Sequence, residues 1–174
     1  MPNPLHRYPS FTHGVHPPEC KDETRHLSIR QFPFAPVLVI PLAQHSGAPS
    51  IAVVREGEEI ERGQLLARAD GFVSVPQHAP ASGVVRRLGL VPGISGKMVD
   101  GIYLQPHPGS TQETKEGVPC DLAASTPDDI IAAIQAAGIV GLGGAAFPTH
   151  VKLKAPEGKH IDTLLLNGVE CEPY

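Results

Sequence analysis

Short apolar runs separated by turn residues occupy residues 36–108. The runs VLVIPL, SIAVV, QLLARA, FVSV, GVVRRL and GIYLQ follow one another at the spacing of about 8 to 12 residues that is typical of an all-β barrel or sandwich. Gly57 and Gly63 supply turn geometry that other residues adopt at a cost, and Ile60, Leu65 and Leu66 provide apolar packing. The pattern predicts a β domain over this region.

A helix is predicted after a polar stretch at residues 109–124 that we interpret as a linker. Thr126 has the N-cap residue type, Pro127 suits the first helical position, and the acids that follow favour the positive end of the helix dipole. An apolar stripe runs along one face, and Gly138 suits the C-terminal stop. The stripe consists of Ile130, Ile131, Ile134 and Ala137.

The uncharged run from Ile130 to Phe147 raises three alternatives: a membrane anchor, a buried core segment or a ligand-holding loop. A spanning helix needs about 20 apolar residues. The predicted helix is only about 11 residues long. Each glycine in a helix lowers its stability by roughly 1 kcal/mol relative to alanine. We therefore expect no direct membrane span. The residues that argue against a membrane-spanning helix are Gly138, Gly141, Gly143, Gly144 and Pro148.

Composition narrows the class of protein. A net charge of −4 with scattered Lys and Arg argues against nucleic-acid binding, and three distant cysteines without CxxC spacing argue for a reducing compartment rather than a disulfide framework. Residues 1–35 are rich in Pro and His and are interpreted as an extended arm. His13, His16 and Cys20 are metal-ligand types, but no second pair completes the usual spacing, so no metal site is expected.

The glycine-rich stretch GLGGAAFPTHVK, residues 141–152, is the strongest candidate for ligand binding. Glycines let backbone N–H groups approach anionic oxygens, and a helix predicted to start near Pro148 and Thr149 strengthens such a site. Lys152 adds a positive charge one turn later. A strand-like run at residues 161–166 places polar residues just past its end, where α/β sheets commonly bind ligands.

Residues 56–85 resemble the biotinyl/lipoyl-like barrel-sandwich family, in the hairpin EGE-x-I-x-x-GQ-x-L and the strand AP-x-SG-x-V. Such domains often carry their cofactor on a lysine at a hairpin tip. The corresponding tip, residues 70–75 (DGFVSV), contains no lysine. The resemblance therefore implies a docking or scaffold role rather than that of a covalent carrier.

Nearly the whole chain resembles the C subunits of the Rnf (Rsx) ion-translocating electron-transport complexes of bacteria. It is more distantly similar to the flavin-bearing NADH-oxidising subunit of respiratory complex I, which has a GGAGFPT loop and an N-x-x-E-x-E-P strand end. The motifs that carry the resemblance are HGVHPPECKDET, VIPLAQHSGAPS, EGEEIERGQLLA, HAPASGVV, GLGGAAFPTHVKL and IDTLLLNGVECEPY, in that order.

This resemblance implies an α+β chain: a barrel-sandwich hybrid at residues 36–108 and the start of an α/β flavin-nucleotide-binding domain at residues 125–174. It also implies FMN and NAD(H) as cofactors. Ala146 stands where the family commonly has glycine, and Val169 replaces an acid of the complex I relative. The cofactor-binding residues carried over are Gly141, Gly143, Gly144, Ala145, Phe147, Thr149, Lys152, Asn167, Glu170 and Glu172.

The family's subunit is longer, and its later part carries two 4Fe-4S clusters on cysteine runs that are absent here. We therefore expect an N-terminal fragment that is inactive alone, with no catalytic residue of its own. The resemblance implies electron transfer between NADH or NAD and ferredoxin through FMN and iron–sulfur clusters, coupled to ion translocation. It implies the other Rnf subunits as partners and a peripheral position on the cytoplasmic face of the bacterial inner membrane. A noncatalytic docking module of the complex is the alternative.

Overall fold

The computed structural model describes residues 20–30, 33–109, 113–114, 117, 121–142, 144–156, 158–163 and 165. The chain divides into two compact units, residues 1–31 with 165–174 and residues 32–164. In the first unit, residues 21–27 form hydrogen-bonded turns in which Arg25 N–H donates to Lys21 O at 2.8 Å. The second unit contains every helix and strand of the described residues.

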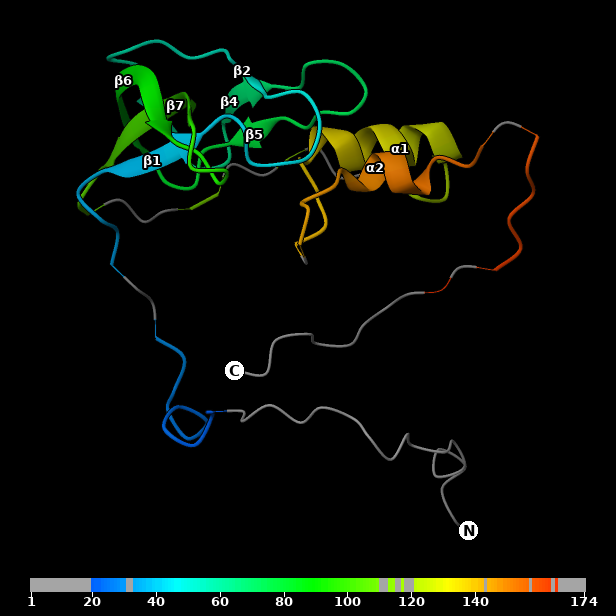
Figure 1. Ribbon diagram of the computed structural model, residues 1–174, viewed down its shortest axis with the longest axis horizontal. Helices are drawn as coiled ribbons and strands as arrows, with labels where there is room; N and C mark the ends of the chain where they lie inside the picture. The colour runs from blue at the N-terminus through cyan, green and yellow to red at the C-terminus, as the bar shows by residue number, and fades with distance from the viewer. Residues whose placement is uncertain are drawn as a thin grey trace. The chain divides into compact units, whose positions relative to one another are not determined.

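Seven antiparallel strands form two small sheets in the described part of the second unit (Figure 1). The four-stranded sheet has the order β1-β7-β6-β3, and the three-stranded sheet has the order β2-β4-β5. Sequence neighbours are often in different sheets, which is the arrangement of a barrel-sandwich hybrid. The strands are β1 (Leu38–Pro41), β2 (Ile51–Ala52), β3 (Glu59–Ile60), β4 (Leu65–Arg68), β5 (Gln77–His78), β6 (Gly83–Pro92) and β7 (Met98–Pro106). We call this part of the chain the barrel.

The core lies between the two sheets. Ile102 and Leu104 of β7 and Leu66 of β4 have no exposed surface. Ile60 and Leu66 are buried as the sequence predicts, but Leu65 is 39% exposed. Adjacent residues of a strand point to opposite faces, so Leu65 and Leu66 cannot both face the core. The β domain predicted from the apolar runs is therefore confirmed, with one packing residue wrong.

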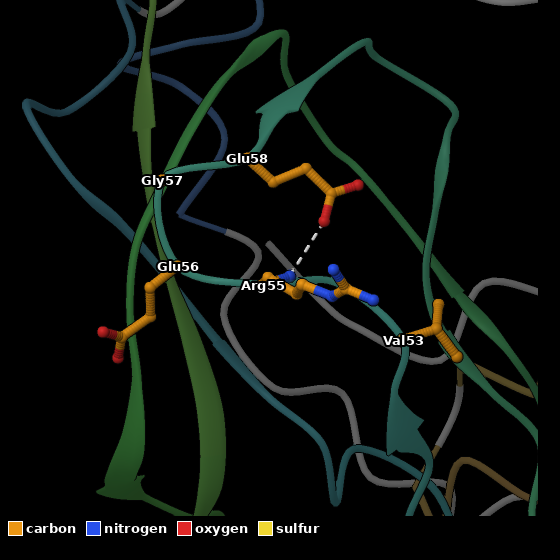
Figure 2. Close-up of a pocket in the computed structure, with 5 residues that line it drawn as sticks. All are labelled: Val53, Arg55, Glu56, Gly57 and Glu58. Carbon is orange, nitrogen blue, oxygen red and sulfur yellow. Dashed lines mark hydrogen bonds between the residues drawn. The ribbon is translucent and has the colours of Figure 1, made fainter.

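Glycines with positive φ make the predicted turns. Gly57 has φ +84° and Gly63 has φ +87°, both in the left-handed region that favours glycine. At the first turn, Arg55 N–H donates to the Glu58 carboxylate at 2.8 Å, while the Glu56 carboxylate extends away and accepts from Leu88 N–H at 2.8 Å (Figure 2). The first bond closes the turn, and the second joins it to β6. A shallow hollow of about 480 Å³ over the turn is lined largely by these polar groups.

Among the described residues, two helices follow the barrel: α1 (Pro127–Ala136) and α2 (Thr149–Leu153). Thr126 caps α1 as predicted. The structure adds a capping box, because Asp129 N–H donates to Thr126 Oγ1 at 3.2 Å and Thr126 N–H donates to the Asp129 carboxylate at 2.9 Å. Hydrogen bonds from Thr126 also lower the pKa of Asp129. Gly138 has φ +72° and ends α1. Both predicted helix starts are confirmed.

The strand predicted at residues 161–166 is wrong for the residues that the structure describes there. Residues 161–163 and 165 are outside any strand. A strand is stable only when a neighbour pairs its backbone N–H and C=O groups, and the described chain offers no strand beside this segment. The hydrophobic pattern of a segment does not show whether such a neighbouring strand exists.

Within the described residues, neither helix reaches the length and hydropathy needed to cross a bilayer.

Replacing Gly83 tests the packing of the four-stranded sheet. A Cβ at Gly83 would lie 2.1 Å from Gln105 O, whereas at Gly89 on the same strand the nearest atom would be Arg87 Nε at 3.5 Å. We predict that Gly83→Ala lowers the free energy of unfolding by about 1–3 kcal/mol because β6 and β7 must separate. Gly89→Ala should change it by less than about 0.5 kcal/mol. Urea unfolding of the two variants decides; equal effects would contradict the close approach at Gly83.

Candidate functional site

The glycine-rich stretch forms a closed loop between α1 and α2. An isolated antiparallel bridge joins Val140 to Pro148, so we call residues 140–148 the glycine loop. Gly141 N–H donates to Phe147 O at 3.0 Å, and Thr149 N–H donates to Ile139 O at 3.1 Å. These bonds fix both ends of the loop, and its middle must therefore turn within a few residues.

The middle of the glycine loop uses left-handed backbone. Gly144 has φ +96°, and a Cβ built on it would meet nothing within 4 Å. Ala146 has φ +47°, which costs a residue with a Cβ about 1 kcal/mol or more. This left-handed backbone explains why glycine suits position 146. Alanine is strained there, and surrounding contacts must offset the strain.

Two of those contacts come from Ser46 in the barrel. Ser46 Oγ donates to Ala145 O at 2.6 Å, and Ser46 N–H donates to Ala146 O at 3.2 Å. The partners of the first bond are 99 residues apart in sequence. The barrel thus holds two successive carbonyl groups of the glycine loop.

Lys152 lies next to the base of the glycine loop. Its Nζ would be only 2.7 Å from a Cβ built on Gly141, so the ammonium group lies over the face that Gly141 leaves bare. Phe147 is half-buried and Thr149 is partly buried at the first position of α2. Helix α2 has only five residues, so the helix-dipole contribution to anion binding that the sequence suggested is small.

The hairpin tip of the barrel, residues 70–75, is held by the two helices. His150 of α2 is fully buried, and its Nε2 donates to Phe72 O at 2.6 Å. The ring of Phe72 packs edge-on against that of His150, with centroids 5.3 Å apart. From α1, Gln135 Nε2 donates to Ser74 O at 3.0 Å. The tip that bears a cofactor lysine in carrier domains is therefore a docking point for helices of the same chain.

A second barrel segment, residues 45–48, lies between the hairpin tip and the glycine loop; we call it the 45–48 turn. Gly47 has φ +116°, and a Cβ there would lie 2.0 Å from Val73 O. Ser74 Oγ donates to Ala48 O at 2.9 Å, and Val75 N–H donates to His45 Nε2 at 3.3 Å. The turn is thereby tied to the tip on one side and, through Ser46, to the glycine loop on the other.

Burial lowers the pKa of His45 from its ordinary value of 6.5, and this outweighs the hydrogen bond to Ala48 O, which raises it. The Nε2 atom also lies 3.1 Å from that carbonyl oxygen. One ring nitrogen cannot serve both partners at once: unprotonated Nε2 accepts the Val75 N–H, whereas protonated Nε2 donates to Ala48 O. The preference of the folded protein for neutral His45 therefore rests on burial of the ring.

A cavity of about 660 Å³ lies on the barrel side of the glycine loop. Its polar groups come from the barrel, at Gln44, His45, Gln77 and His78, and its apolar wall includes Leu142 and Ala146. Of the residues predicted to bind a cofactor, none that the structure describes lines this cavity. The predicted residues thus lie outside the lining of this cavity.

The structure brings six of the ten predicted residues into one region. Gly141, Gly144, Ala145, Phe147, Thr149 and Lys152 belong to the glycine loop or to α2 directly after it. Gly143, Asn167, Glu170 and Glu172 lie outside the described residues, as do His13 and His16. Sequence reasoning did not identify Ser46, Gln135 or His150, because each acts through a contact distant in sequence that no local pattern announces.

Comparison with known proteins assigns the two parts of the chain to families. Residues 9–108 match the family described as the RnfC barrel sandwich hybrid domain. The chain belongs to this family. Residues 134–174, which include the glycine loop, match the family described as the Nuo51 FMN-binding domain. The predicted fold class, a barrel-sandwich hybrid followed by the start of a flavin-binding domain, is confirmed.

Curated relatives of this RnfC-family chain are C subunits of ion-translocating complexes. The C subunit of the proton-translocating ferredoxin:NAD(+) oxidoreductase complex of Clostridium ljungdahlii is 40% identical over 95% of this chain and 36% of the relative. Its Na(+)-translocating counterpart from Acetobacterium woodii is 38% identical over 97% of this chain and 38% of its own length. The C subunit of the ion-translocating oxidoreductase complex of Pseudomonas aeruginosa is 40% identical over 98% of this chain and 22% of its own length. The chain therefore spans between about a fifth and two fifths of these relatives.

Removing the His150 side chain tests the attachment of the helices to the barrel. We predict that His150→Ala lowers the free energy of opening of α1 and α2 by about 2–4 kcal/mol, because it deletes a buried hydrogen bond and leaves a cavity. Amide hydrogen exchange at Ala137, whose N–H bonds to Ala133 O, measures this opening.

His160→Ala is the matched control, since His160 is exposed. It should leave exchange at Ala137 unchanged. Equal protection in both variants would show that the buried His150 bond does not hold the helices.

The lowered pKa of His45 predicts a pH dependence of stability. The unfolded chain binds a proton at His45 more readily than the folded chain, so this group's contribution is present above pH 6.5 and is lost as pH falls through the window just below it. We measure the free energy of unfolding with urea at about pH 7.5 and about pH 5.5, roughly one unit on each side of the ordinary histidine pKa. Between these two pH values it should fall more in the natural chain than in His45→Gln. An identical pH dependence in both proteins would refute the assignment to His45.

Proposed function

We propose that the glycine loop of this chain forms part of an FMN site in an Rnf-type C subunit, which exchanges electrons with NAD(H). The observation that carries the proposal is the match of residues 134–174, which include the glycine loop, to an FMN-binding family. Relatives named as ferredoxin:NAD(+) oxidoreductase subunits support the choice of electron donor and acceptor.

The residues present fit an anionic, planar cofactor. Gly144 leaves open space where a side chain would stand, and the loop beside it is exposed. Backbone N–H groups in such a loop suit phosphate oxygens, and the Lys152 ammonium at Gly141 adds a positive charge. Phe147, half exposed, offers an apolar surface next to these polar groups.

In this proposal the chain binds and orients, and the cofactor carries the redox chemistry. FMN, when bound, supplies hydride and single-electron exchange. Gly141, Gly144 and Ala145 would let the glycine loop approach the cofactor closely, and Lys152 would neutralise phosphate charge. Asn167, Glu170 and Glu172, together with Gly143, complete the binding set that the family resemblance implies.

The proposed setting is a membrane-associated complex. The other Rnf subunits are the partners, and the protein lies peripherally on the cytoplasmic face of the bacterial inner membrane. FMN and 4Fe-4S clusters would supply the electron transfer between NAD(H) and ferredoxin, coupled to ion translocation. Residues 1–174 contain three scattered cysteines, so the cysteine runs that the family resemblance implies for 4Fe-4S clusters are not among them.

Flavin titration tests the proposal. The full-length gene product that contains residues 1–174, stripped of flavin, should bind FMN saturably and acquire NADH-dependent ferricyanide reduction. Lys152→Ala should weaken FMN binding about 10- to 100-fold, because a charge-assisted phosphate contact contributes about 1.5–3 kcal/mol. Riboflavin, which lacks the phosphate, should lose this dependence on Lys152.

Lys159→Ala is the charge-matched control, because Lys159 is exposed beyond α2. Its FMN affinity should equal that of the natural protein. Absence of saturable FMN binding, with retained binding to the other members of the complex, would overturn the flavin site and favour a noncatalytic docking module.

A further inference from the structure

We propose that Ser46, a residue of the barrel, is a positioning residue for the glycine loop. It sets the direction in which the backbone N–H groups of the loop point. This inference rests on the proposed flavin site. It assigns to the barrel a direct part in building that site. The two hydrogen bonds from Ser46 to Ala145 O and Ala146 O carry it.

Peptide geometry converts these carbonyl contacts into amide directions. In a trans peptide the C=O of one residue and the N–H of the next point in opposite directions. None of the peptide bonds is cis among the residues that the structure describes. Since Ala145 O and Ala146 O both face Ser46, the N–H groups of Ala146 and Phe147 point away from the barrel. Two successive amides are thus presented together, as an anion-binding backbone requires.

The bonds to Ser46 also offset the strain at Ala146. Its φ of +47° is unfavourable for alanine, and a relaxed backbone there would rotate the flanking peptides. The bond from Ser46 N–H to Ala146 O restrains one of those peptides, and the bond from Ser46 Oγ to Ala145 O restrains the other. Loss of the hydroxyl alone therefore releases the peptide between Ala145 and Ala146.

Ser46 can act in this way because its own position is fixed. Gly47 lies against Val73 O with no room for a side chain, and His45 accepts the N–H of Val75. The hairpin tip that holds the 45–48 turn also binds Gln135 of α1 and His150 of α2, the helices that precede and follow the glycine loop. The loop is thus held by Ser46 and, through α1 and α2, by the hairpin tip.

The test compares Ser46→Ala and Ser46→Thr in the full-length gene product. Ser46→Ala should raise amide exchange at Gly141 and Thr149, which close the base of the loop, and weaken FMN binding about three- to tenfold. It should also change the visible circular dichroism of bound FMN, since the flavin surroundings shift. Ser46→Thr keeps the hydroxyl and should restore all three readouts.

Ser95→Ala, an exposed serine in the turn between β6 and β7, is the matched control and should behave as the natural protein does. Unchanged exchange at Gly141 and Thr149 in Ser46→Ala would overturn the inference, with or without flavin. Faster exchange with unchanged FMN affinity and spectrum would overturn the link to the cofactor. Failure of the natural protein to bind FMN would refute the flavin site, and the exchange data would then decide the role of Ser46 alone.

Discussion

The attachment of the glycine loop and its flanking helices to the barrel depends on hydrogen bonds to backbone carbonyl groups where these segments meet. Peptide carbonyls that lose water must find donors, or folding bears their desolvation cost. Phe72 O and Ser74 O receive donors from α2 and α1, and the carbonyls of the loop receive theirs from Ser46. The donors come from both sides of the contact; the bonds to Phe72 O and Ser74 O are partly buried, and the bond from Ser46 Oγ to Ala145 O is exposed.

This arrangement changes the use of a barrel-sandwich domain. In the carrier proteins that the barrel resembles, the hairpin tip often bears the cofactor on a lysine. Here the tip consists of residues without a lysine, and the buried imidazole of His150 binds its backbone. The tip thus supports the helices that follow the barrel. The same support reaches the glycine loop through the 45–48 turn, where close contact with Val73 excludes a side chain at Gly47.

The local features of this fold could be predicted from sequence, and the contacts between distant segments could not. Thr126 and Pro127 predict the start of α1 because capping depends only on the next few residues. Gly57 predicts a turn because glycine adopts positive φ at little cost, and the structure gives it φ +84°. The run at residues 161–166 has a strand's composition, but pairing requires a neighbour that composition does not reveal. Position 146 shows both cases: its departure from the family's glycine is visible in sequence, while its left-handed backbone and the restraint from Ser46 are visible only in three dimensions.

Native-state hydrogen exchange over the whole second unit, residues 32–164, tests most directly whether barrel and glycine loop form one cooperative structure. Increasing urea in small steps separates local opening from global unfolding. Our account predicts that the amides of Gly141 and Thr149 open together with that of Ala48, which bonds to Val73 O in the barrel. Exchange of the loop amides at the rate of an unfolded chain, while Ala48 stays protected, would contradict it.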